Sequence, residues 1–357
     1  MTLLSVLGEA WRNLRAGTVG ALVLAVATSA LLGALAIVDV RAVADGAARA
    51  AAFRDAGAGV QTIDAYGAVD AAGCEALAAA NDVVAAGAVR EDLGGFTPSV
   101  LPGSQLPLFD VTPGLVDLLT GAPQGTHGGE GAWLPVPLAR DLGVEAGDLL
   151  PSTRGTVTVA GTYDYPSDGR DRLLAYGVLT PVPATTEPFD TCWFSVWPAR
   201  PVGDGWLAGA LVGEPADARY GQLNTRLGTT IDLDALGAGR STRHLPWLAA
   251  GVVALVAGLA VRRRRTEHAS ALHAGVRRSA LALQTAVETL CWSVAGAVVA
   301  LPVVLVVAQQ APDGAAWAAT VAGLRVLAAG AAAAPLGALA ALALTRERHL
   351  FRYFKER

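Results

Sequence analysis

The chain has 357 residues, of which 53% are hydrophobic and only 16% are charged, and its formal net charge is −4. These values exclude a disordered protein and differ from those of a typical soluble enzyme, whose charged fraction lies near ~25%. The 41 glycines show no three-residue period, which excludes a collagen-like chain. The apolar residues fall into four separate blocks, a distribution typical of a membrane protein.

The first apolar block covers residues 18–38 and carries no charged residue. An α-helix needs about 20 apolar residues to cross the roughly 30 Å hydrocarbon core of a bilayer. A cleaved signal peptide is the alternative, because Arg12 and Arg15 precede the block and Ala42-Val43-Ala44 resembles a cleavage site. The apolar part of a signal peptide is usually ~7–15 residues long. We therefore favour a retained membrane span.

The segment 39–244 follows and is long enough to form a domain with its own core. Strands are predicted over 60–64, 156–163, 173–179 and 191–197, and helices over 41–54, 70–80, 138–142 and 204–212. The stretches 94–107 and 121–137 are rich in Pro and Gly and are predicted to be loops. This mixture predicts an α+β domain.

Single residues indicate where three of these helices begin or end. The alanine-rich stretch 41–54 is predicted to continue the first span as a helical stalk that ends at Gly57. Asp70 is a plausible N-cap, and Gly143 is a plausible C′ residue.

Two of the three cysteines, Cys74 and Cys192, lie in this segment, whereas Cys291 lies in the third apolar block. An even pair in an oxidising compartment suggests a disulfide. Two separately buried thiols are the alternative, because no sequence feature shows that the two residues are close.

The remaining blocks predict membrane spans at 245–261, 287–308 and 326–344, with a short loop at 309–325 between the last two. The second span is short, but Arg243 and the run Arg262–Arg265 can extend to the membrane surface at its ends.

The fourth span is rich in alanine and is predicted to depend on neighbouring helices. Gly330, Ala334, Gly337 and Ala341 recur at three- or four-residue spacing, which lets helix backbones approach closely. An alanine-rich composition without any packing role is the alternative.

The short loops predict the orientation of the spans. Residues 262–286 carry six Arg against one Glu, whereas residues 309–316 carry Asp313 and no basic residue. The positive-inside rule then places 262–286 in the cytoplasm, and both termini with it. The tail 345–357 agrees, with five basic and two acidic residues. Residues 39–244 are accordingly extracytoplasmic.

The loop 262–286 is predicted to contain a short helix. Thr266 can act as its N-cap, Glu267 suits the first turn, and Gly275 can end it before a second helix begins near Ser279. Such a helix between two spans is either a docking element or part of a basic loop attracted to anionic lipid.

Catalytic motifs are absent from the sequence. It contains neither G-x-x-x-x-G-K-[ST] nor H-E-x-x-H, and His268 and His273 do not share a helix face. We therefore predict that the chain is not an enzyme and has no metal site or cofactor of its own.

The same loop carries a motif that resembles the MacB/FtsX-like ABC transporter permeases. The matching positions are Arg263, Glu267, Ala269, Leu272, Ala274, Gly275 and Arg278, followed by Glu288 and Gly296. His273 departs from the pattern, because the family usually has Arg there. The stretches 136–148 and 157–161 resemble a helix–Gly–strand unit of the family's external domain. Residues 10–15 resemble the amphipathic helix, here 1–17, that precedes the first span.

The resemblance implies four transmembrane helices and an α+β extracytoplasmic domain inserted between helices 1 and 2. It also implies a homodimer or a heterodimer with a similar permease in the plasma membrane, in contact with lipid. A separate cytoplasmic ATPase would bind ATP and Mg, and no nucleic acid is expected. Residues expected to couple to the ATPase are Glu267, His268, Ala271, Leu272, Gly275, Arg277 and Arg278, with Leu272 as the apolar anchor and Glu288 at the start of the third span.

The resemblance leaves several functions open. An export permease for a peptide, lipid, lipoprotein or drug is the first. A mechanical regulator of a cell-wall hydrolase, as in FtsX-type members, is the alternative and would need an extracytoplasmic partner. A sensor that signals through the cytoplasmic loop is the third.

Overall fold

The computed structural model describes residues 3–17, 20–127, 130–184, 187–199, 205–213, 215, 217–312 and 314–345. It divides into two compact units, a helical unit of residues 1–49 and 234–357 and a sheet-rich unit of residues 50–233. The predicted basic tail lies outside the described residues except for Thr345, and so do Thr18, Asp204 and Asp313.

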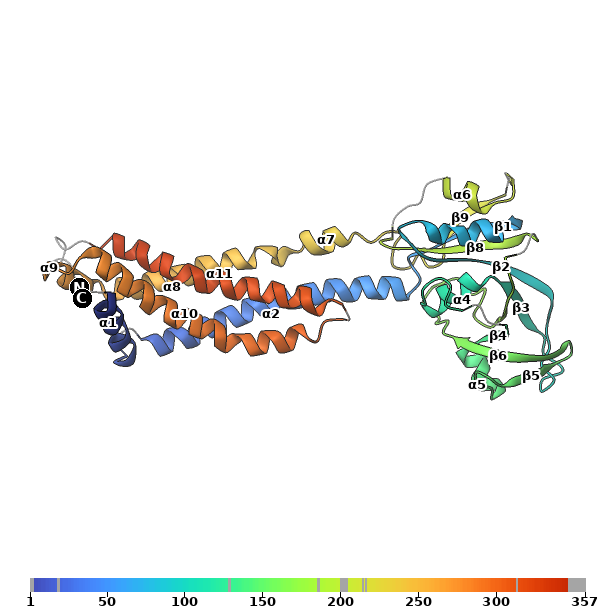
Figure 1. Ribbon diagram of the computed structural model, residues 1–357, viewed down its shortest axis with the longest axis horizontal. Helices are drawn as coiled ribbons and strands as arrows, with labels where there is room; N and C mark the ends of the chain where they lie inside the picture. Colours follow the sequence, from blue (N-terminus) through green and yellow to red (C-terminus); the bar gives the residue numbers. More distant parts are fainter. Residues whose placement is uncertain are drawn as a thin grey trace. The chain divides into compact units, whose positions relative to one another are not determined.

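The helical unit contains the long helices of the chain (Figure 1). Its elements are α1 (Leu3–Arg15), α2 (Ala21–Asp55), α7 (Leu233–Ala238), η2 (Ser241–His244), α8 (Leu245–Arg263), α9 (Arg265–His273), α10 (Arg278–Ala308) and α11 (Ala316–Ala343). Four of them are long and apolar enough to cross a membrane, namely α2, α8 with η2, α10 and α11. The stalk predicted over 41–54 is helical as the C-terminal part of α2, and Gly57 follows it with φ +68.

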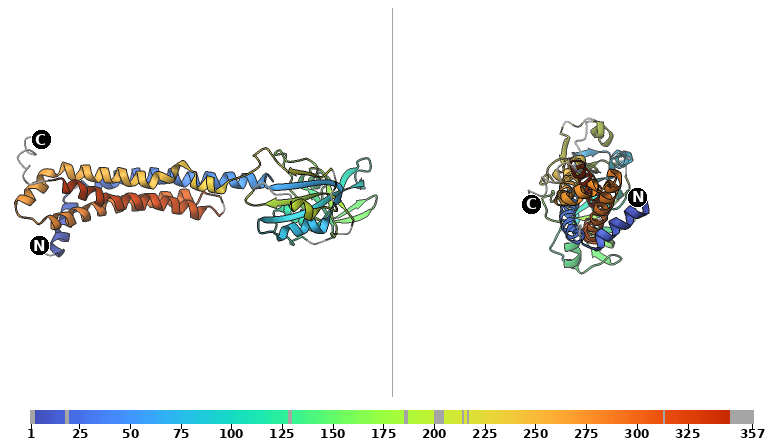
Figure 2. Two further views of the ribbon diagram at one scale, coloured as in Figure 1. Left: turned by 90° about the horizontal axis from the view of Figure 1, so that it is seen from above. Right: turned by 90° about the vertical axis from the view of Figure 1, so that its left-hand side faces the viewer.

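The long helices lie side by side (Figure 2), and small residues let them approach closely. A Cβ atom added to Gly337 of α11 would lie 1.9 Å from the carbonyl oxygen of Ala254 on α8, and one on Gly330 would lie 2.3 Å from Leu32 of α2. On α10, a Cβ at Gly296 would lie 2.8 Å from the carbonyl oxygen of Ala25. The prediction that small residues in the fourth span let neighbouring helices approach is therefore confirmed.

The sheet-rich unit is built on one nine-stranded sheet among its described residues. Its strands are β1 (Val60–Val69), β2 (Val83–Phe96), β3 (Leu106–Val111), β4 (Ala132–Pro135), β5 (Leu149–Ser152), β6 (Gly155–Tyr163), β7 (Val178–Pro181), β8 (Phe189–Val196) and β9 (Arg219–Gln222). The strand order is β5-β6-β4-β7-β3-β2-β8-β1-β9. The pairs β3–β7 and β4–β6 are parallel, and the other pairs are antiparallel.

Short helices cover the sheet. They are α3 (Ala71–Ala76) with η1 (Leu77–Ala79), α4 (Pro113–Thr120), α5 (Val136–Leu142) and α6 (Gly205–Ala210). Asp70 caps α3 by accepting a hydrogen bond from the Ala72 N–H, and Gly143 follows α5 with φ 65. Both helix-end signals predicted from the sequence are therefore confirmed.

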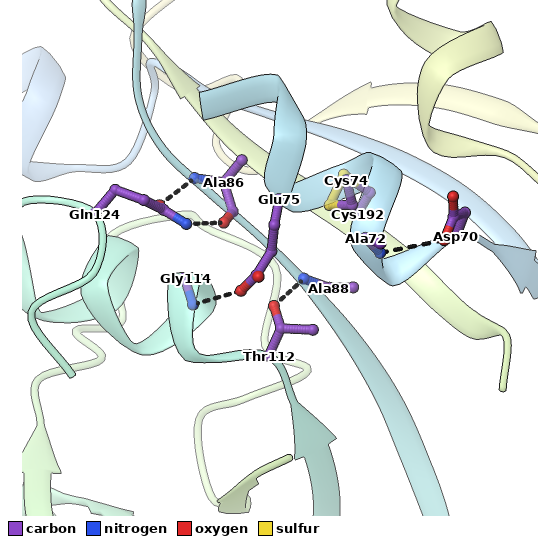
Figure 3. The surroundings of a disulfide bond; sticks show 10 residues. All are labelled: Asp70, Ala72, Cys74, Glu75, Ala86, Ala88, Thr112, Gly114, Gln124 and Cys192. Carbon is purple, nitrogen blue, oxygen red and sulfur yellow. Dashed lines mark hydrogen bonds between the residues drawn. A yellow bond between two sulfur atoms is a disulfide. The ribbon is translucent and has the colours of Figure 1, made fainter. Parts of the chain in front are cut away.

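The predicted disulfide is present and joins α3 to the sheet (Figure 3). Cys74 on α3 is bonded to Cys192 on β8, with the two Cα atoms 5.8 Å apart and both residues fully buried. Next to it, the Glu75 carboxylate accepts a hydrogen bond from the Gly114 N–H at the start of α4 (3.0 Å). A Cβ on Gly87 of β2 would lie 2.1 Å from the Leu115 nitrogen, so this glycine lets α4 lie directly on the sheet.

Several predictions for this unit are wrong. Residues 173–177 form turns rather than a strand, which begins only at Val178. The stretch 121–137 contains β4 and the start of α5, because Ala132–Pro135 is a buried strand despite its flanking glycines. The sequence analysis also missed β2, β3 and α4. Strand β2 is rich in Ala and Gly and lacks the alternation that marks a half-buried strand.

Candidate coupling site

The short helix between α8 and α10 is the element that the sequence motif singles out. Helix α9 spans Arg265–His273 and has two distinct faces. His268, Ala269 and Leu272 are buried against the helical unit, at a spacing that places them on one side of the helix. Glu267, Ser270 and His273 are exposed, whereas Ala271 is half-buried.

A buried ion pair fixes the beginning of α9 to α10. Arg264 Nη1 donates to Glu288 Oε2 at 2.8 Å, and the side chain of Glu288 is only 2% exposed. The other oxygen of Glu288 accepts from Asn13 Nδ2 (2.7 Å) and from Gln284 Nε2 (3.0 Å). Arg264 Nε also donates to Glu267 Oε2 at 2.8 Å. We call these five residues the Arg264–Glu288 network.

The network also holds the N-terminal helix. Val6 and Ala10 of α1 are buried, and Asn13 lies on the same face one further turn along. The opposite side of α1 exposes Leu4, which is 82% accessible, and Trp11. An amphipathic helix with an exposed apolar face is suited to the membrane interface.

Burial and neighbouring charges set the protonation states at this site. Burial acts to lower the pKa of Arg264, but its hydrogen bonds to Glu267 and Glu288 outweigh burial, so the pKa is raised and the guanidinium stays charged. Burial, assisted by the charge of Arg264, lowers the pKa of His268 below 6.5. His268 is therefore neutral at pH 7, and no second charge competes with Arg264 for Glu288.

The structure corrects the role expected for Leu272. This side chain is 9% exposed and packs within the helical unit, so it is not an exposed anchor for a partner. His268 is likewise buried, whereas Gly275, Arg277 and Arg278 are exposed. Thr266 is not the N-cap, because α9 already includes Arg265 and is capped by Arg264 without a side-chain hydrogen bond.

Gly275 has the role expected from the sequence, because it follows α9 with φ +84. In that backbone region a side chain is strained. The Gly275 N–H donates to the Leu272 carbonyl (3.1 Å) and the Val276 N–H donates to that of Ala271 (3.1 Å). These bonds close the helix and turn the chain toward α10.

The sequence analysis identified Glu288 but missed its partners. Arg264 lies in a run of four arginines, and nothing in the run distinguishes the one that becomes buried. Asn13 and Gln284 belong to helices whose facing sides could be inferred only from the packing.

Two cavities flank the turn between α9 and α10. One, of about 480 Å³, lies between α1 and this turn and is lined by Val6, Arg277 and Leu283, among others. The other, of about 240 Å³, lies between α10 and α11, and Leu272 and Arg278 contribute to its walls.

The four long apolar helices and the separate sheet-rich domain with its disulfide define the chain as a membrane protein.

No protein-family model matches the sequence, and no curated protein matches it. Among solved structures, the chain is similar to the periplasmic region of MacB from Actinobacillus actinomycetemcomitans. The match has 10% sequence identity, covers 44% of this chain and 82% of that chain, and has a TM-score of 0.32. The similarity is distant and does not define a function.

Proposed function

We propose that the chain is the permease subunit of an ABC-type transporter and that α9 transmits the motion of a separate cytoplasmic ATPase. The observation that carries the proposal is the Arg264–Glu288 network, which fixes a short exposed helix to a membrane-crossing helix. A rigid connection of this kind passes a displacement of α9 on to α10.

The exposed face of α9 supports contact with a partner. Glu267, Ser270 and His273 lie along it, and the half-buried Ala271 lies beside them. Short side chains at Ser270 and Ala271 leave room for the side chains of a partner. Leu272 instead lies on the buried face of α9 and packs within the helical unit. Interface energy concentrates in a few central positions, so we place the centre of the contact at Ser270.

The distribution of charge supports a cytoplasmic position for α9. Six arginines lie between 262 and 286, and arginine accumulates in cytoplasmic loops. The sheet-rich domain, inserted between the first two spans, is then extracytoplasmic, where its disulfide is stable. On this proposal, ATP-driven motion acts on that domain and serves to export a peptide, lipid, lipoprotein or drug.

The test uses the intact chain, purified from its native membrane in mild detergent together with its partners. We expect an ATPase with a P-loop to co-purify, and we expect its activity in lipid to depend on the chain. Ser270→Tyr adds bulk at the centre of the proposed contact without touching the buried face of α9. Arg262→Tyr adds the same side chain to an exposed position on α8 and is the matched control.

We expect Ser270→Tyr to lower both co-purification and stimulated ATP hydrolysis by at least tenfold, with Arg262→Tyr close to wild type. Leu272→Asp is not a clean test, because it places a charge inside the helical unit. Full coupling in the Ser270→Tyr protein would contradict the proposal.

A further inference from the structure

The cavity between α10 and α11, which we call the α10–α11 groove, has the chemistry of a lipid site. It is lined by Leu272, Arg278, Leu281, Ala282, Leu339, Leu342, Ala343 and Thr345, and its volume is about 240 Å³. Arg278 is the charged member of this lining, and leucine and alanine side chains supply most of the rest. A positive group at one end of an apolar groove matches an anionic head with a hydrocarbon tail.

The length of α10 places the groove at the membrane surface. Its 31 residues span about 46 Å, which exceeds the roughly 30 Å hydrocarbon core of a bilayer. The first turns of α10, with Arg278 and Leu281, therefore extend into the headgroup region. Leu339 and Leu342 are at the matching end of α11. The groove is thus open at the depth where phosphate groups and the first acyl carbons lie.

The surrounding charge favours an anionic lipid over a zwitterionic one. Arg277 and Arg278 are both exposed at the start of α10. Within the part of the chain that the structure describes, the acidic side chains beside α9, Glu267 and Glu288, are both bonded to Arg264. Among the described residues, neither of them forms an ion pair with Arg277 or Arg278.

We propose that the α10–α11 groove binds one anionic phospholipid, whose phosphate contacts Arg278 and whose acyl chain lies along Leu281, Leu339 and Leu342. Leu272 of α9 forms part of the same wall. A bound lipid therefore packs under the proposed coupling helix and supports its position. This inference does not depend on an ATPase partner.

The test measures lipid binding to the intact chain in detergent by native mass spectrometry. The probes are dioleoyl phosphatidylglycerol and dioleoyl phosphatidylcholine, added separately. We expect phosphatidylglycerol to bind about fivefold more tightly, the ratio that one basic residue near a lipid surface supplies. Arg278→Gln is expected to bring the ratio below twofold. Arg263→Gln, at an exposed position outside the groove, is the matched control and is expected to keep it.

A second variant tests the apolar part of the site. Ala282→Phe fills the groove and should weaken binding of both lipids, whereas a soluble phosphate site would be unaffected. Competition by millimolar inorganic phosphate equal to that by lipid would overturn the lipid assignment. Lipid binding that is unchanged in the Ala282→Phe protein would also overturn it. If Arg263→Gln and Arg278→Gln lower the preference for phosphatidylglycerol equally, that preference comes from general surface charge and the groove is not its source.

Discussion

The helical unit and the sheet-rich unit bury their interiors with different residues. Of the 17 buried members of the helical cluster, nine are alanine. The cluster around Trp133 and Trp193 in the sheet-rich unit has no alanine among its buried members and includes Phe109 and Tyr163. The helical cluster is closed by small residues that bring backbones together, and this cluster of the sheet-rich unit is filled by large side chains. A second cluster of the sheet-rich unit, around Cys74 and Cys192, has five alanines among its 13 buried members.

This difference follows from the solvent that each unit faces. Water drives large apolar side chains into a core, whereas lipid gives helices no comparable reason to associate. Helices in lipid instead gain close van der Waals contact, which requires Gly and Ala at the interface. The two units also differ in the links that hold their elements together. The helical unit has the buried Arg264–Glu288 network, and the sheet-rich unit has a covalent bond.

The largest effect is expected from removing the covalent bond of the sheet-rich unit. Cys74→Ala with Cys192→Ala opens a loop of 118 residues and should lower the free energy of unfolding by about 4–5 kcal/mol. Pulse proteolysis of the intact chain in urea measures the change. The quantity followed is the amount of the fragment that contains the sheet-rich unit. Cys291→Ser, at an exposed free thiol, should leave the value unchanged. A loss under about 1 kcal/mol in the double variant would refute the loop-closure explanation.

The next effect tests close contact in the helical unit. Gly337→Leu forces a side chain into the Ala254 backbone and should cost about 3 kcal/mol through overpacking. Gly251→Leu, on α8, is the control, because a Cβ added there meets nothing within 4 Å. Thermal unfolding in detergent should separate the two variants clearly. Equal stability of both would mean that α8 and α11 do not need this contact.

A buried ion pair and an exposed one give the third comparison. Glu288→Gln keeps the shape of the side chain but removes the charge that Arg264 faces, so we expect a loss of about 2 kcal/mol. Glu9→Gln removes the exposed pair with Arg12 on α1 and should cost under about 0.5 kcal/mol. Thermal unfolding at low and high salt measures both. If Glu288→Gln and Glu9→Gln lose a comparable amount of stability, burial does not make the Arg264–Glu288 pair stronger than an exposed pair.

The parts of the fold that were predicted from the sequence are those with a local signal. The four apolar helices follow from hydropathy alone, because each must match the thickness of a bilayer. The disulfide was predicted because the third cysteine lies in an apolar block. The ends of α3 and α5 were predicted because Asp70 and Gly143 act on their own neighbours.

The missed parts depend on contacts between distant residues. Strand β2 carries Gly87 because α4 lies on it, and the sequence cannot show that a helix 25 or so residues later will do so. The coupling site was predicted only in part, for the same reason. The motif around Glu267 located α9, but which of its residues face inward follows from its packing within the helical unit. The burial of Leu272 was missed because α9 was treated as an isolated helix.

The last comparison concerns a partly exposed ion pair in the sheet-rich unit. Arg170 donates to both carboxylate oxygens of Asp168, at 3.0 and 2.7 Å, and to the carbonyl of Asp55 at the end of α2 (2.8 Å). Burial acts to raise the pKa of Asp168, but the bonds from Arg170 outweigh it, so the pKa lies below 3.8. The folded state therefore favours the carboxylate. The stabilisation is present above pH 3.8 and is lost as the pH falls through the lower, folded value.

Because Asp168 is partly exposed, solvent screens the pair and Asp168→Asn should cost only about 0.5–1 kcal/mol at pH 7. The difference from wild type should shrink as the pH falls below 3.8 and should also shrink at high salt. Urea unfolding of the intact chain, followed by tryptophan fluorescence over this pH range, measures it. Asp141→Asn, at an exposed position on α5, is the control. A difference that persists unchanged in acid would mean that Asp168 acts through its shape and hydrogen bonds. Its charge would then contribute nothing, and the contrast with the buried pair at Glu288 would be larger still.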